Sequence, residues 1–589
     1  MNHEPLKKRL CLRIDADLSV LTAACVLPAL LALVAGLWRE GQVSSLLLLD
    51  VFDLQFVTQD VPAAVVMIVT GLFCLWFSSR NSIENQRFLL ERCYQWRWLL
   101  AGALFVFCVA GSLNVYRMAA ISGDEYANIL QTGIFAAFPG SGSFYGQWPA
   151  EIAQQMLAPE LANRILVDQS GRLITSYQPV FSMLAAPFEL AGMRFLFNPL
   201  LAAGVVLMVP ACISRMTRVR WVAGLGVLMV AGSASVSGFG ISSFATNLIL
   251  FLHLVFLWFV MGGLESKTAN ARFCHGLGAG LAGGLAMHTG NQMPHLLAAG
   301  PLLAWLLYRR QFALLAGMAA IYGPLFYAFT ISWTRIVHAV SLVHRDHVAG
   351  ASGESGLVGA ELGWLAAHIK LPTTRQFAQD SMSVLRFLLW ASPGMGGLFL
   401  VNRNSSLIIN DGHQAVWIRP LSRVILVSAT LAAIFYFFFP LNQGHGWGYR
   451  YLQPVLGFFL VAGLVRWTAF DPDGKTVSWM LLSSLVSLAV MVPLRTSQIS
   501  AFVAERQTLL PCIPGKGAQI CFVDPSRIYW GPDLIQNRPF VSLSQPVVAP
   551  LVLRSSGADA DEALVQKYWP GARQVEGWNS PGSGSVWSL

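Results

Sequence analysis

Apolar runs long enough to cross a lipid bilayer recur along the whole chain, and they constrain its fold more than any other feature. A helix needs roughly 20 apolar residues to span a hydrocarbon core of about 30 Å. Charged residues make up 12% of the 589 residues, about half the share found in soluble domains. We therefore expect an all-α polytopic membrane protein. Thirteen spans are predicted, at residues 18–37, 61–78, 98–118, 195–213, 221–238, 244–262, 276–288, 294–308, 312–333, 384–401, 424–441, 452–466 and 477–494.

The placement of lysine and arginine predicts which side of the membrane each loop occupies. Short basic loops favour the cytoplasm, and Lys7, Lys8 and Arg9 precede the first span. That run is too long for the core of a cleaved signal peptide. We therefore expect a multi-pass protein of a bacterial inner membrane with a cytoplasmic N-terminus and an outer-side C-terminal tail. The predicted units are a two-span extension (1–97), a transmembrane core (98–494) and an outer appendage (495–589).

Two other segments on the predicted outer side are expected to be structural. Residues 179–190, punctuated by prolines, are read as a short re-entrant or interfacial helix. Asp50, Asp53 and Asp60 are read as a solvated acidic loop. The basic residues show no pattern typical of a nucleic-acid module, so membrane lipids, rather than nucleic acid, are the expected surroundings.

Cys512 and Cys521 lie close together in the polar tail, whereas most other cysteines fall in predicted spans. Disulfides persist on the oxidising side of a membrane. Pro511, Pro514 and nearby glycines suggest a turn that brings the two sulfurs together. A disulfide is predicted, with two buried thiols as the alternative.

An acidic pair, Asp124 and Glu125, follows the third span at the outer surface. Carboxylates at a membrane edge are costly unless they are solvated, paired or used. Asp124 could act as a general base. The alternative is a solvated turn in which Glu125 opens a helix, since acidic residues favour a first turn.

Further polar segments lie on the same predicted face. Tyr177 precedes Gln178-Pro179 at a helix start, and His288 begins a polar hinge (288–295) between two spans. In the run 442–454, three glycines surround aromatic residues and Arg450, whose guanidinium suits phosphate. Helix capping and interfacial anchoring are the structural alternatives. A metal is not excluded, although the cluster His338, His344, Arg345, Asp346 and His347 lacks a recognisable ligand spacing.

Taken in order, these segments resemble the GT-C superfamily of membrane glycosyltransferases. The likeness is to bacterial proteins of the dolichyl-phosphate-mannose protein mannosyltransferase type and to lipid A aminoarabinose transferases. It rests on the acidic pair 124–125, the Tyr-x-Pro segment 177–179 and the run 446–454. It covers about residues 98–495, with a looser likeness in the tail around Tyr529–Pro539. Two spans precede the acidic pair where the family usually has one, and the hinge at 288–295 lacks the family's usual Arg-Pro pair.

The resemblance implies an inverting transfer of a hexosyl or pentosyl group from a polyprenyl-phosphate donor to a lipid, glycan or protein acceptor. Asp124 would be the general base, and Glu125 would position the base or the acceptor. The expected substrate- and phosphate-binding residues are Arg450, Tyr449, Tyr177 and His288, with Arg117, Arg345, Lys370 and Arg375 as alternatives. The rival hypotheses are a transporter or flippase of a lipid-linked saccharide, which should show internal repeats and midplane charges, and a non-catalytic family member.

Overall fold

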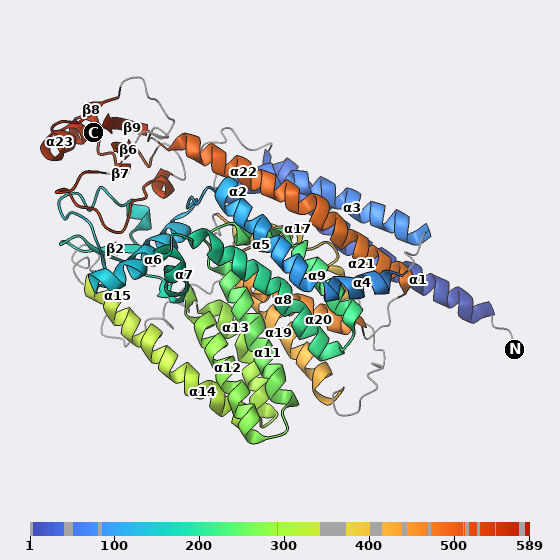
Figure 1. The fold of residues 1–589 in the computed structure, drawn as a ribbon. Coiled ribbons are helices and arrows are strands. Elements are labelled where there is room, and N and C mark those ends of the chain that lie inside the picture. Colours follow the sequence, from blue (N-terminus) through green and yellow to red (C-terminus); the bar gives the residue numbers. More distant parts are fainter. Residues whose placement is uncertain are drawn as a thin grey trace.

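Long helices dominate the computed structural model, and short strands gather at one end of the bundle (Figure 1). The structure describes residues 4–40, 51–80, 85–290, 292–341, 373–400, 415–438, 445–468, 473–510, 512, 518–526, 531–547, 549–575 and 583–589. Within these residues, eight helical segments are long and apolar enough to cross a membrane. They are Asp17–Leu37, Val51–Ser79, Arg97–Asn114, Arg194–Thr217, Thr246–Glu265, Phe312–Val340, Trp417–Phe438 and Gly474–Leu509.

The described residues do not confirm the predicted count of thirteen spans. Helices α9 (Arg220–Ala231) and α10 (Ala234–Gly240) form a pair bent by 56°, which would make nine spans if they count as one. Three other predicted spans form helices that are not among the eight membrane-length segments. They are α12 (Ala269–Met287), α13 (Met293–Tyr308) and a short apolar helix at Gln453–Thr468.

The predicted span 384–401 is divided into two helices. Helix α17 (Thr374–Trp390) ends before Pro393, and α18 (Gly397–Leu400) begins after it. Gly394 adopts a φ of 83°, a left-handed conformation that favours glycine. A proline followed by this glycine interrupts the helix, which an apolar average over the segment does not reveal.

Helix α6 (Gly123–Ser141) carries the acidic pair in its first turn. The Ser122 side chain caps it by accepting a hydrogen bond of 3.3 Å from the Glu125 amide. Next to it lies a small antiparallel sheet of β1 (Gly146–Gln147), β3 (Arg172–Thr175) and β2 (Ile165–Val167). Strand β4 (Gln178–Pro179) pairs with β5 (Thr289–Gly290) and leads into α7 (Val180–Leu190). The Tyr-x-Pro segment and the polar hinge are therefore neighbours.

The C-terminal appendage is a four-stranded mixed sheet ordered β7-β6-β9-β8, accompanied by α23 (Ala558–Tyr568). Its strands are Leu551–Arg554 (β7), Gln519–Val523 (β6), Ser583–Ser588 (β9) and Arg573–Gln574 (β8). The predicted boundary at residue 495 falls inside α22 (Val492–Leu509), whose Pro493 stands in the first turn and does not end the helix. The appendage proper begins after this helix.

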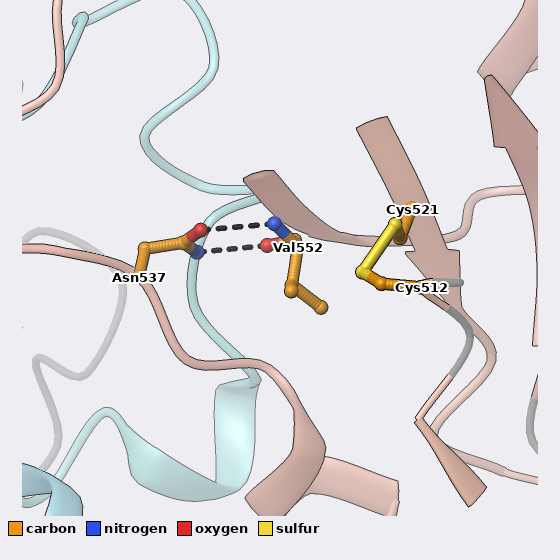
Figure 2. The surroundings of a disulfide bond; sticks show 4 residues. All are labelled: Cys512, Cys521, Asn537 and Val552. Atoms are coloured by element: carbon orange, nitrogen blue, oxygen red, sulfur yellow. Dashed lines mark hydrogen bonds between the residues drawn. A yellow bond between two sulfur atoms is a disulfide. The ribbon is translucent and has the colours of Figure 1, made fainter. Parts of the chain in front are cut away.

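Cys512 and Cys521 are joined by a disulfide that ties the end of α22 to strand β6, with their Cα atoms 5.5 Å apart (Figure 2). Beside it, the amide of Asn537 donates to the Val552 carbonyl at 2.7 Å and accepts from the Val552 amide at 3.0 Å. Asn537 also donates to the Met156 carbonyl at 3.1 Å. The same residue therefore fastens the appendage to the segment before β2.

We expect Cys512→Ser to destabilise the appendage by roughly 2–3 kcal/mol, because a short covalent loop restricts the unfolded chain. Limited proteolysis and a thermal melt in detergent would measure the loss. Cys274→Ser is the control, since Cys274 is an exposed free cysteine. Alkylation of unreduced protein should modify Cys274 and spare Cys512 and Cys521. Full alkylation of all three would contradict the disulfide.

Candidate active site

A cavity of about 740 Å³ lies where loops and short strands meet the helices. Its volume is within the usual size range of ligand pockets. Its polar lining includes Asp124, Arg164, Tyr177, Arg450 and Asp533. Its apolar lining comes from helices α11 (Thr246–Glu265) and α13 and from the neighbouring loops, and includes Phe244, Ile249, Pro294 and Pro454. The cavity is therefore amphipathic, with charged groups from loops and apolar groups from the bundle.

Asp124 is the centre of the polar lining. Arg164 Nε lies 2.7 Å from its Oδ1 atom, and Arg450 pairs through Nη1 with its Oδ2 atom. Tyr177 donates its hydroxyl hydrogen bond to the same carboxylate. Burial alone would raise the pKa of Asp124, but Arg450, Arg164 and Tyr177 outweigh it and hold the pKa well below its usual value. Asp124 is therefore ionised, and its basicity is low while both arginines contact it.

Local packing explains why these side chains converge. The Trp333 indole donates to the Tyr177 carbonyl at 2.9 Å and so fixes the residue before β4. The Arg450 guanidinium lies 5.1 Å from the Tyr451 ring centroid and 5.6 Å from that of Phe244. Aromatic faces of this kind support a guanidinium while leaving its edge able to bond. Burial opposes the charged form of Arg450, and Asp124 more than reverses this, so the pKa of Arg450 is raised.

Glu125 is fully buried and serves a different purpose from its neighbour. Its Oε2 atom accepts from the Tyr116 hydroxyl at 2.7 Å and from the Ile121 amide at 3.1 Å. Its Oε1 atom accepts from the Ser243 amide at 2.8 Å. Burial raises the pKa of Glu125 to about 7, although these hydrogen bonds oppose the shift. Glu125 joins the start of α6 to the loop before α11, which supports a positioning role.

Several other predicted site residues make structural contacts. His288 ends α12, where its ring nitrogens lie 2.8 Å from the Gly284 carbonyl and 2.9 Å from the Thr330 hydroxyl. Tyr449 donates to the Tyr436 carbonyl at 3.3 Å. Arg117 has a φ of 53° and donates to Gln507 at 2.5 Å. Arg345 and Lys370 lie outside the described residues, as does the side chain of Arg375.

Three cavity residues received no role from the sequence. Arg164 follows the short helix Pro159–Leu161, Asp533 belongs to the appendage, and His445 lies in the run 442–454. No motif surrounds Arg164, and Asp533 lies in the tail segment 529–539, where the sequence likeness was only loose. Their shared position at one cavity appears only once distant segments pack together. In the described part of the chain, no group of three or more His, Cys, Asp or Glu side chains could hold a metal ion.

The expectation of a solvated acidic loop around Asp60 is wrong. Asp60 is fully buried, with Arg386 Nε at 2.8 Å and Arg495 Nη2 at 2.9 Å from its carboxylate. Asp53 is also buried, at 3% exposure. A short segment between two predicted spans looks solvated when its partners lie hundreds of residues away.

No protein-family model matches the chain, and no curated protein matches it. The solved structures similar to it include ArnT from Cupriavidus metallidurans in the apo state and the same protein bound to undecaprenyl phosphate. Both are 14% identical to this chain and cover 83% of it and 97% of their own length, with TM-scores of 0.38 and 0.37. This likeness is too distant to carry a function across, so the chemistry below rests on this chain's own residues.

The pKa of Glu125 predicts a pH-dependent stability. A carboxyl whose pKa rises on folding from 4.5 to about 7 stabilises the fold fully below pH 4.5, and this contribution is lost as the pH rises through 7. Relative to Glu125→Gln, the wild type should therefore lose up to about 3 kcal/mol between these limits. Thermal melts of both proteins from pH 4 to 8 measure the difference. A difference that stays constant with pH would show that Glu125 does not titrate in this window.

Proposed function

We propose that the protein is an integral membrane glycosyltransferase that moves a sugar from a polyprenyl-phosphate donor to an acceptor at the outer face of the membrane. The observation that carries this proposal is the pair of guanidinium groups, Arg164 and Arg450, converging on Asp124 in an amphipathic cavity. Guanidinium groups suit phosphate, and the apolar lining suits a prenyl chain. The outer location follows the lysine and arginine pattern of the loops.

The reaction requires a leaving group, a nucleophile and a base. An acceptor hydroxyl or amine attacks the anomeric carbon while the bond between that carbon and the phosphate oxygen breaks. The phosphate leaves with the electron pair, and Asp124 takes the acceptor's proton. Negative charge grows on the phosphate during this step, and Arg450 and Arg164 stabilise it. Attack opposite the leaving group inverts the anomeric centre.

The contacts of Asp124 suggest how the donor switches the base on. In the structure, both arginines are paired with Asp124, and its pKa is held low. A donor phosphate competes for the same guanidinium groups. As these contacts pass to the phosphate, the pKa of Asp124 returns toward its usual value, and Asp124 becomes a stronger base. The base is therefore active only when the donor is bound.

Asp124→Asn should reduce transfer by about 10²–10⁴-fold, the usual cost of losing a general base. Undecaprenyl phosphate should bind the variant at least as tightly as the wild type, because both arginines lose a competing carboxylate. Binding to purified protein gives the affinity. The activity is measured in cells. Polyprenyl-linked glycans and their products are compared between a deletion strain and strains complemented with the wild type or with Asp124→Asn. Wild-type turnover in the variant would remove Asp124 from this role, and unchanged glycans on deletion would contradict transfer.

Arg450→Lys should weaken undecaprenyl phosphate binding by roughly tenfold or more, because lysine keeps the charge but loses the planar fork. Arg172→Lys is the matched control. Arg172 also forms an arginine–aspartate pair, with its Nε atom 2.7 Å from Asp168, but it lies on β3 and its own side chain is 46% exposed. Titration of both variants measures the contrast. If both variants bind undecaprenyl phosphate with the same affinity, Arg450 does not bind the phosphate and serves only as a structural partner of Asp124.

A further inference from the structure

We propose that Asp533, from the C-terminal appendage, is a positioning residue that holds the two halves of the active site in register. Its Oδ1 atom accepts a hydrogen bond of 2.6 Å from the amide of Gly123, the residue before Asp124. Its Oδ2 atom lies 2.9 Å from His445 Nε2, in the same loop as Arg450. One carboxylate therefore bridges the helix that bears the base and the loop that bears the phosphate-binding arginine.

The surroundings show that this bridge is built into the fold. The main-chain carbonyl of Asp533 accepts from Arg506 Nη2 and from Gln536 Nε2, both at 2.6 Å. Gln536 also donates to the Ala120 carbonyl at 3.0 Å. A Cβ atom on Gly123 would lie 2.4 Å from a Leu161 methyl and 3.2 Å from Asp533 Oδ1. Glycine at this position is what permits the close approach.

Asp533 lines the cavity, so a direct catalytic role is the competing explanation. Its side chain is 17% exposed, but both oxygens are engaged by protein donors from α6 and the 445–451 loop. A general base must present a lone pair to the acceptor proton. The two oxygens of Asp533 instead contact Gly123 and His445, in the two segments that it joins, which favours a positioning role.

The bridge matters most when the donor is bound, and this part of the inference rests on the proposed function. The contact between Asp124 and Arg450 also links the two halves. A donor phosphate that takes over Arg450 removes that link. Asp533 then becomes the contact that keeps Asp124 and the arginine at a productive separation. Small displacements of reacting groups can cost about 10²-fold in rate.

The test compares Asp533→Asn with Asp533→Ala. Asparagine keeps an oxygen for the Gly123 amide, and its amide nitrogen can donate to His445 in the other tautomer. A positioning role therefore predicts near wild-type kcat in Asp533→Asn and a roughly 10–100-fold lower kcat in Asp533→Ala. Asp561→Ala is the control in the same appendage, because Asp561 accepts from Ser555 and Ser556 beside α23. It should change appendage stability without changing kcat.

Hydrogen exchange separates this inference from the proposed function. Asp533→Ala should speed exchange in peptides covering 119–128 and 445–452, more strongly with undecaprenyl phosphate than without it, whereas Asp533→Asn should not. If Asp533→Ala does not fold, His445→Ala tests the same bridge from its other end. Two outcomes would contradict the bridging role of Asp533. One is hydrogen exchange in Asp533→Ala at the wild-type rate, and the other is Asp533→Asn with a kcat as low as that of Asp533→Ala. If Asp533→Ala exchanges faster but the wild type does not bind undecaprenyl phosphate, the bridging role of Asp533 stands and the proposed polyprenyl-phosphate donor is contradicted.

Discussion

The buried ion cluster around Asp60 ties together segments on which the active site depends. Arg386 and Arg495 contact Asp60 at 2.8 and 2.9 Å, and all three side chains are at most 1% exposed. The Trp390 indole adds a hydrogen bond of 2.7 Å to the same carboxylate. Arg386 also donates to the Gly446 carbonyl at 3.3 Å. The N-terminal extension is thereby joined to α17, α22 and the loop that carries Arg450.

The Asp60 and Asp124 centres share one arrangement but differ in accessibility. Each carboxylate lies between two guanidinium groups, because a buried charge is costly unless it is paired and hydrogen-bonded. At Asp60 the groups are sealed inside the bundle, so breaking the cluster would leave buried arginines without their counter-charge. At Asp124 the side chain is 15% exposed and faces a cavity. A ligand can therefore exchange with the second set of ion pairs but not with the first.

The sequence predicted what local patterns encode. Apolar length identified eight membrane-length helices, and neighbouring polar residues identified Asp124, Tyr177 and Arg450 as residues that now share one cavity. Helix breaks at bends and at Pro393 were missed because an average over an apolar window does not register them. Arg164 and Asp533 could not be found, since their contacts join residues that lie 40 and 410 positions apart. A single sequence carries no signal for such pairings.

The distribution of polarity in the cavity favours an amphipathic donor, with one charged part and one apolar part. The charged residues come from α6, the segment after β1, the 445–451 loop and the appendage, whereas Ile249 and Pro294 come from membrane-bundle helices. A water-soluble nucleotide sugar would place polar groups against that apolar lining and leave them without partners. A prenyl phosphate would match both ends at once, with its phosphate on the arginines and its chain toward the bundle.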